Sequence, residues 1–200
     1  AVVIALLIVY LVWGSTYLAI RIGLDGWPPF LLGGSRFIAA GLLLLLFGWW
    51  RRKSLPKSWP QLRTLLVTGV LMLTFGNAGV VWAEQYVPSG MAAVIIATVS
   101  LWMMALEALR PGGERMTWAK FGGAIIGLAG VAVLMLPQLT NGRNEKMLFG
   151  QLLLLGAAVS WAIGSIYSKH APMPKSNIMG SGVQMLAGGI AQLILAGING

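Results

Sequence analysis

The chain has 200 residues, of which 58% are hydrophobic and only 10% charged, and its mean hydropathy is +0.81. Soluble domains carry about 25% charged residues, so this composition excludes a soluble globular domain and indicates an integral membrane protein. The absence of cysteine and the single His170 exclude disulfides, thiolate metal sites and a histidine cluster within these residues.

Apolar runs near twenty residues long recur along the chain, which is the length a helix needs to cross about 30 Å of hydrocarbon. Segments rich in Pro, Gly or charge, such as 26–29 and 87–90, separate them. Backbone polar groups must be paired inside a bilayer, which favours helices. We therefore predict an all-α integral membrane bundle of about seven transmembrane helices, at approximately 1–22, 30–50, 63–84, 89–109, 117–137, 147–168 and 178–198.

Basic residues are distributed unequally among the predicted connections. The connections after spans one, three and five hold only three basic residues, namely Arg21, Arg143 and Lys146. Cytoplasmic loops are enriched in Lys and Arg, so the bias predicts a cytoplasmic N-terminus and argues against a nucleic-acid partner for the net charge of +9. The connections after spans two, four and six hold ten basic residues, namely Arg51, Arg52, Lys53, Lys57, Arg63, Arg110, Arg115, Lys120, Lys169 and Lys175.

Polar and aromatic residues recur at helical spacing in the first span. Tyr10, Trp13 and Tyr17 follow one another at three- and four-residue steps, with Ser15 between them. Such a face is typical of a cavity wall for a small organic solute. It is equally typical of an aromatic belt at the membrane surface, and both interpretations stay open.

Charged and amide groups inside the second and third spans indicate a functional site, because buried polar groups are unfavourable in a bilayer. Asn77 lies mid-span, where it either contacts substrate or bonds to a neighbouring helix. Arg36 either snorkels, pairs with Asp25 or Glu84, or binds an anionic solute group. Glu84 is a candidate for proton coupling, although its expected shallow depth also fits a solvated or Arg-paired role.

Two later spans add candidates for the same cavity. Thr98 and Trp102 stand four residues apart in the fourth span. In the sixth span, Trp161 and Ser165 occupy a face that resembles the one around Trp13. Local packing is the alternative role for each of these four residues.

An internal repeat is visible at low similarity. Positions 148 residues apart pair Gly34 with Gly182 and Gly41 with Gly189, in spans two and seven. An odd number of helices per repeat inverts the second copy, an arrangement found in many secondary transporters. Two such units need roughly 296 residues, so we expect the chain to be a fragment in which the second unit stops after two helices.

Several segments in the same order resemble one known family: 13–21, 35–41, 83–84, 88–94 and 113–115, followed by Trp118 and 122–131. The series is similar to the EamA-type permeases of the drug/metabolite transporter superfamily, in particular to bacterial exporters of amino acids and metabolites. The resemblance implies ten helices in two inverted repeats, here a first repeat at 1–137 and the start of a second at 147–200. It also implies alternating access to a central cavity that helices one, three, four and six line.

Two departures from the family pattern affect these expectations. Ser100 stands where related sequences often have a proline, which puts a bend of the fourth helix in doubt. Family helices eight to ten have no counterpart, so transport by these 200 residues alone is doubtful.

The expected function is that of a secondary transporter, a permease or exporter of amino acids or related amphipathic solutes, in a bacterial inner membrane. Its partners would be the lipid bilayer and a small-molecule substrate, with proton coupling left open and no cofactor or metal. The alternatives are a nucleotide-sugar or lipid carrier and a channel or structural subunit. An enzyme is disfavoured, since the five acidic residues are scattered and form no paired or metal-binding motif.

Overall fold

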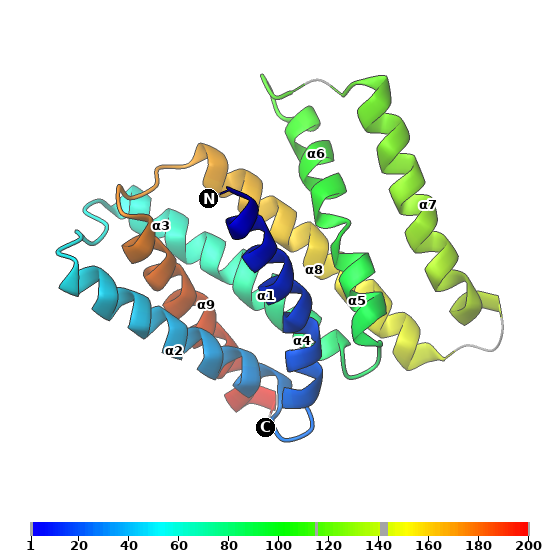
Figure 1. Cartoon of the computed structure of the whole chain (residues 1–200), viewed down its shortest axis with the longest axis horizontal. Helices are drawn as coiled ribbons and strands as arrows, with labels where there is room; N and C mark the ends of the chain where they lie inside the picture. Colours follow the sequence, from blue (N-terminus) through cyan, green and yellow to red (C-terminus); the bar gives the residue numbers. More distant parts are fainter. Residues whose placement is uncertain (1, 115, 141–143, 200) are drawn as a thin grey trace.

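The computed structural model describes residues 2–114, 116–140 and 144–199. Within these ranges it is a bundle of helices (Figure 1). The helices are α1 (Val2–Gly23), α2 (Pro29–Trp50), α3 (Trp59–Thr68), the π-helix η1 (Gly69–Ala78), α4 (Gly79–Ala83), α5 (Ser89–Ile96), α6 (Val99–Leu109), α7 (Trp118–Thr140), α8 (Glu145–His170) and α9 (Asn177–Asn199).

Six helical stretches of the described chain are long and apolar enough to cross a membrane. They are α1, α2, the continuous run α3–η1–α4, the run α5–α6, α8 and α9, while α7 adds a shorter apolar stretch. The predicted all-α membrane bundle is therefore confirmed.

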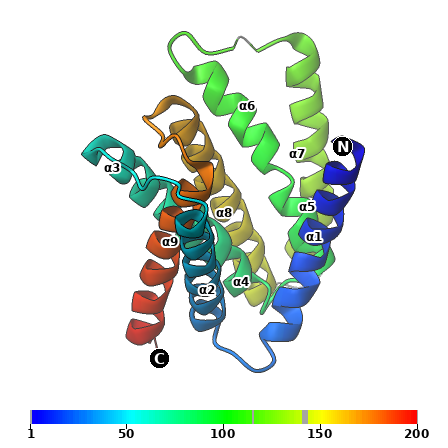
Figure 2. The ribbon, with the colours of Figure 1, turned by 60° about the vertical axis from the view of Figure 1, so that its left-hand side comes forward.

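The helices have two common ends (Figure 2). The C-terminal ends of α2, α6 and α8 lie at one end, which we call the Glu107 end after its most buried acid. The end of α1, the end of α4 and the starts of α2 and α5 lie at the other, which we call the Glu84 end. Successive spans thus run in opposite directions, as the alternation of basic connections predicts.

Helices α2 and α9 lie side by side along most of their length (Figures 1 and 2). Glycines allow their backbones to approach closely, as small residues do in many membrane helix pairs. A Cβ atom built on Gly34 would lie 3.1 Å from the carbonyl oxygen of Gly189, and one on Gly41 would lie 3.0 Å from that of Gly182. A side chain at any of these positions would push the two helices apart.

The third span contains ten residues of π-helix, a form that is rare and frequently marks functional sites. Side chains from neighbouring helices bond to its carbonyl oxygens. Ser160 Oγ of α8 donates to the oxygen of Leu71 at 2.8 Å, and Gln192 Nε2 of α9 donates to that of Leu73 at 2.7 Å. These bonds tie η1 to α8 on one side and to α9 on the other.

The fourth span is interrupted between α5 and α6 although it has no proline there. Two hydroxyl groups bond to carbonyl oxygens three residues earlier: Thr98 Oγ1 to Ile95 at 2.7 Å, and Ser100 Oγ to Ala97 at 2.9 Å. Such local bonds compete with the helical backbone ladder. The interruption that the proline-free sequence left in doubt is therefore present.

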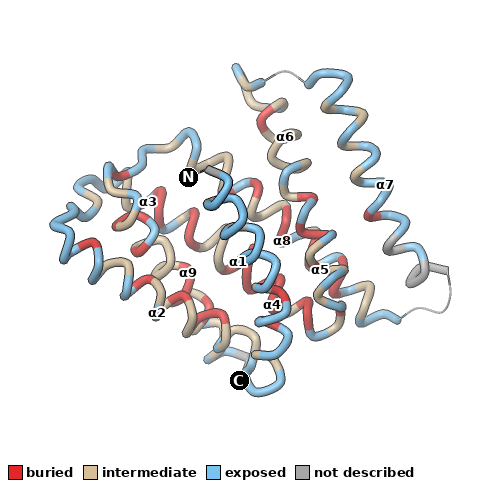
Figure 3. Tube along the Cα trace, in the orientation of Figure 1, coloured by how far each residue is buried: buried red, intermediate tan, exposed pale blue. Residues whose placement is uncertain are grey.

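The best-buried apolar side chains gather where α1, α4, α5 and α8 meet (Figure 3). Val81, Ile95, Leu154 and Ala158 have no exposed surface. The outer faces carry large exposed apolar residues, among them Trp49 with 77% of its surface exposed. Apolar side chains on the outside suit contact with lipid, the reverse of a soluble protein's surface. The site is therefore formed by the interior faces of α1, α2, η1 and α8.

Candidate functional site

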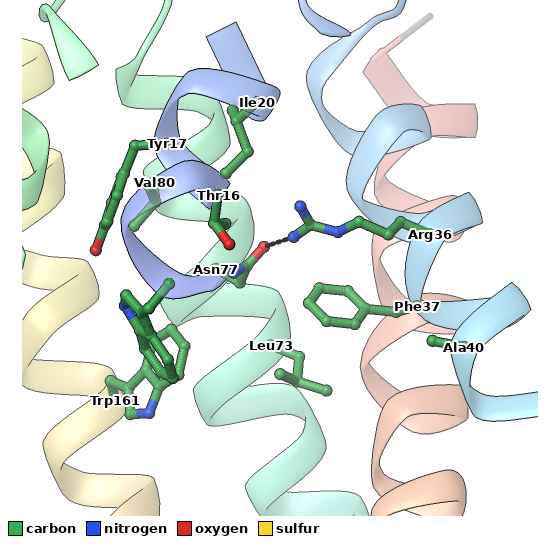
Figure 4. A pocket seen from close by; sticks show the side chains of 11 residues that line it. Thr16, Tyr17, Ile20, Arg36, Phe37, Ala40, Leu73, Asn77, Val80 and Trp161 are labelled. Carbon is green, nitrogen blue, oxygen red and sulfur yellow. Dashed lines mark hydrogen bonds between the residues drawn. The ribbon is translucent and has the colours of Figure 1, made fainter. Parts of the chain in front are cut away.

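A cavity of about 370 Å³ opens between α1, α2, η1, α4 and α8 (Figure 4). Its volume falls in the range of sites for small organic ligands, roughly 300–1,000 Å³. Its walls are mostly apolar with a few polar groups, formed by Trp13, Thr16, Tyr17, Ile20, Arg36, Phe37, Ala40, Leu73, Asn77, Val80 and Trp161.

On one wall of the cavity, a hydrogen bond joins two lining side chains from different helices. Arg36 reaches from α2 toward η1, and its Nη2 donates to Asn77 Oδ1 at 2.8 Å (Figure 4). The Arg36 guanidinium also lies 5.0 Å from the ring centre of Phe37, within cation–π range. The charge of Arg36 is thus held in the cavity by an amide and a ring, with no carboxylate in an ion pair with it among the described residues.

The opposite wall is aromatic. The rings of Trp13 on α1 and Trp161 on α8 are tilted by 48° with their centres 5.7 Å apart. Tyr17 packs above them with only 9% of its surface exposed. Such rings give an apolar body a large contact surface and keep polar edges for orientation.

The π-helix positions the polar wall. Asn77 is the next-to-last residue of η1, and it is buried with 9% exposure. Because η1 is held from α8 by Ser160 and from α9 by Gln192, the direction in which Asn77 points depends on both neighbours. A regular α-helix over the same residues would rotate Asn77 to another face.

Glu84 lies beyond the cavity, at the end of α4. Its side chain is fully buried, and neither carboxylate oxygen has a hydrogen-bond partner among the described residues. Arg21 approaches it from α1, but the guanidinium donates to the main-chain oxygen of Glu84 and not to the carboxylate. The expected solvated or Arg-paired state of this acid is not what the structure shows.

The structure brings five of the predicted site residues to one cavity: Trp13, Tyr17, Arg36, Asn77 and Trp161. The tilted indole pair places the first and sixth spans side by side at this cavity.

The other predicted cavity residues lie elsewhere. Tyr10 has 69% of its surface exposed, and Ser15 is exposed with its hydroxyl bonded to the carbonyl oxygen of Val12. Thr98 and Trp102 pack in and against the core of the bundle, and Ser165 is half-buried outside the cavity lining. Spacing along a helix groups residues on a face but does not fix which way that face turns, and these five positions turn away.

Six lining residues were not predicted, and most of them are apolar. Ile20, Phe37, Ala40, Leu73 and Val80 differ in no sequence property from residues that face lipid. Thr16 had a usable signal, because it lies beside Tyr17 and three residues after Trp13 on the predicted face.

Among the described residues, no group of three or more His, Cys, Asp or Glu could hold a metal ion. The cavity itself offers a guanidinium, an amide, two hydroxyls and two indoles. Such groups suit reversible binding of an amphipathic solute, with the cation for an anionic group and the rings for an apolar body.

Comparisons with known proteins agree with the architecture. The chain is 40% identical over 197 residues to the uncharacterized inner membrane transporter YedA of Escherichia coli K12, covering 98% of this chain and 62% of that protein. It is 33% identical over 174 residues to a probable amino-acid metabolite efflux pump of Salmonella typhimurium, covering 84% of this chain and 54% of that protein. A solved crystal structure superposes with a TM-score of 0.64 at 26% identity, covering 96% of this chain and 65% of the other.

The chain therefore spans less than two thirds of the length of these relatives. The EamA-like transporter family matches residues 1–136, more than half of the chain. Together with the multi-pass helical bundle, this match shows that the chain belongs to the EamA-like transporter family.

Proposed function

We propose that the chain forms the substrate cavity of a secondary transporter for amino acids or related amphipathic metabolites. The observation that carries the proposal is the cavity of about 370 Å³ with the Arg36–Asn77 pair on one wall and the Trp13–Trp161 pair on the other. A cation opposite indoles suits a solute that has an anionic group and an apolar body. The relative named as an amino-acid metabolite efflux pump points to the same class of solute.

The packing of α2 on α9 supports two inverted repeats. The sequence offset of 148 residues relates Gly34 to Gly182 and Gly41 to Gly189. In the structure Gly34 contacts Gly189, and Gly41 contacts Gly182. Replacing each glycine by its repeat equivalent therefore turns the first contact into the second. A twofold axis between inverted copies produces this relation. Rocking of one copy against the other about this glycine seam would open the cavity to each side in turn.

The proposal is tested by ligand-dependent thermal stabilisation across a panel of amino acids and amphipathic cations. A solute that binds the folded state raises the melting temperature by mass action. We expect a shift for amino acids with an apolar side chain. The shift should be lost in Trp13→Ala and Asn77→Ala.

Trp49→Ala is the matched control, because Trp49 has 77% of its surface exposed on the outer face of α2. It removes an indole without touching the cavity. Equal shifts in wild type and all three variants, or no shift with any solute, would refute the proposed cavity.

A further inference from the structure

Glu84 is a fully buried acid that the proposed cavity does not use. Its side chain has no exposed surface, and both carboxylate oxygens lack a hydrogen-bond partner among the described residues. An ionised carboxylate is strongly disfavoured in such a place unless a cation or donor contacts it. The arrangement seen here therefore favours the neutral carboxylic acid over the carboxylate.

Two cations lie near enough to act on this acid but bond elsewhere. Arg21 of α1 donates to the Glu84 main-chain oxygen, and Arg36 of α2 donates to Asn77 Oδ1 at 2.8 Å. The charges of both, and the Tyr17 hydroxyl of α1, interact electrostatically with the carboxyl group. The side toward α8 is closely packed, since a Cβ on Gly150 would lie 3.2 Å from the Ala83 carbonyl oxygen and from the Cβ of Tyr86.

Arg36 connects the acid to the cavity. Asn77 and Glu84 are seven residues apart on one continuous helical run, two turns along nearly the same face. Val80 lies between them and lines the cavity. The long side chain of Arg36 meets this face and can bond to Asn77 or turn toward Glu84. It cannot do both at once, because a bidentate bond to one group occupies the guanidinium.

Building on the proposed function, we propose that Glu84 is a proton-binding site that controls the cavity through Arg36. With Glu84 protonated, Arg36 stays at Asn77 and binds the anionic group of a solute. The carboxyl group of Glu84 can release its proton to water at the Glu84 end. The Arg36 guanidinium then pairs with the carboxylate and no longer binds the anionic group of a solute. Solute binding then requires the return of one proton, so one anion and one proton occupy the protein together.

The test uses purified chain with L-phenylalanine, whose carboxylate suits Arg36 and whose ring suits the indoles. L-phenylalaninamide, which lacks the carboxylate, is the matched probe. As the pH rises through the titration of Glu84, the Kd for L-phenylalanine should increase by up to about tenfold per pH unit, as linkage to one proton requires. The Kd for the amide should not follow this curve.

Glu84→Gln keeps the shape of the protonated acid and cannot ionise. We expect it to bind L-phenylalanine as wild type does at low pH, with no dependence on pH. Glu107→Gln, a change of the same kind at the other end of the bundle, should keep the wild-type pH profile. A pH-independent wild type, or the same pH profile in Glu84→Gln, would overturn the proposal while leaving the cavity assignment intact.

A measurement without ligand separates this proposal from the cavity assignment. Infrared spectroscopy of the wild type at neutral pH should show a protonated carboxyl band that is absent from Glu84→Gln. If neither probe binds but the band is present, the proposed solute fails and the buried acid remains. If the band is missing from wild type, Glu84 is ionised and the proton site is wrong.

Discussion

Glu84 and Glu107 lie near opposite ends of the bundle, and their surroundings differ. Glu107 Oε2 lies 3.2 Å from His170 Nε2 and 3.4 Å from Lys169 Nζ, and its Oε1 lies 3.7 Å from Arg110 Nε. The carboxylate oxygens of Glu84 have no such partner among the described residues. Both side chains are buried, so depth alone does not explain the difference.

Glu107 is in the position of a structural acid, whereas Glu84 is the acid that we propose to change its charge. The cationic side chains of Lys169 and Arg110 and the ring of His170 surround Glu107, so ionisation is favoured there. Lys169 and His170 belong to the end of α8, so removal of the charge would loosen the contact between α6 and α8. At Glu84 the nearby guanidinium groups are engaged by Asn77 and by a main-chain oxygen. The Glu107 end is thus held together by ion pairs, while at the Glu84 end the cations bond to groups other than the carboxylate.

The largest expected effect concerns which end faces which side of the membrane. The chain has no cysteine, so single substitutions Gly26→Cys and Ser54→Cys each report one position. Both residues are exposed. The first belongs to the connection between α1 and α2, at the Glu84 end, and the second to the connection between α2 and α3, at the Glu107 end. With an impermeant maleimide on intact cells, we expect labelling at 26 only, because basic loops remain in the cytoplasm.

Permeabilised cells provide the control, since both positions should then react. Labelling of position 54 in intact cells would invert the predicted topology. The Glu84 end would then face the cytoplasm, and a proton released there would not pass to the outside.

The next effect, on affinity, compares an arginine from each cluster. Arg36→Ala should weaken L-phenylalanine binding by about 10- to 100-fold, because a charged hydrogen bond contributes about 1.5–3 kcal/mol. Arg110→Ala removes the same side chain from the Glu107 cluster and should leave the Kd unchanged. Titration by thermal stabilisation measures both variants. A similar loss in both would mean that the effect comes from stability and not from the cavity.

Sequence patterns predicted the fold well because a bilayer restricts it. Runs of about twenty apolar residues must be helices there, and the predicted boundaries at 30–50 and 89–109 lie within one residue of α2 and of the α5–α6 run. The assignment of both Trp13 and Trp161 to the cavity followed from the similarity of two spans, and the structure adds that their rings lie side by side. Length, apolarity and repetition are properties of the chain itself, so they can be seen without a structure.

The cavity was predicted only in part, because its lining depends on rotation and on neighbouring helices. Tyr10 shares a spacing with Trp13 but turns outward with 69% exposure. No residue pattern predicts the π-helix over Gly69–Ala78, whose wide turn sets the direction of the Asn77 side chain. The burial of Glu84 was also unexpected, since it results from helices that pack over it and not from its place near the end of a span.

The smallest expected effect, on stability, compares the two acids. Glu107→Gln should lower the melting temperature of the folded chain by a few degrees, since Lys169, His170 and Arg110 lose a charged partner. The loss is limited because the side chains of Lys169 and Arg110 are 54% and 38% exposed and remain hydrated. Glu84→Gln should change stability by less than about 0.5 kcal/mol, because it replaces a neutral group with a neutral one of the same shape.

Melting curves of the two variants in the same detergent, recorded at low and high salt, measure this difference. Salt should reduce the gap between wild type and Glu107→Gln, because it screens partly exposed ion pairs. The melting temperature of Glu84→Gln should not respond to salt differently from wild type. If Glu84→Gln were instead the more damaging change, Glu84 would be an ionised and paired residue, and the contrast between the two ends would be reversed.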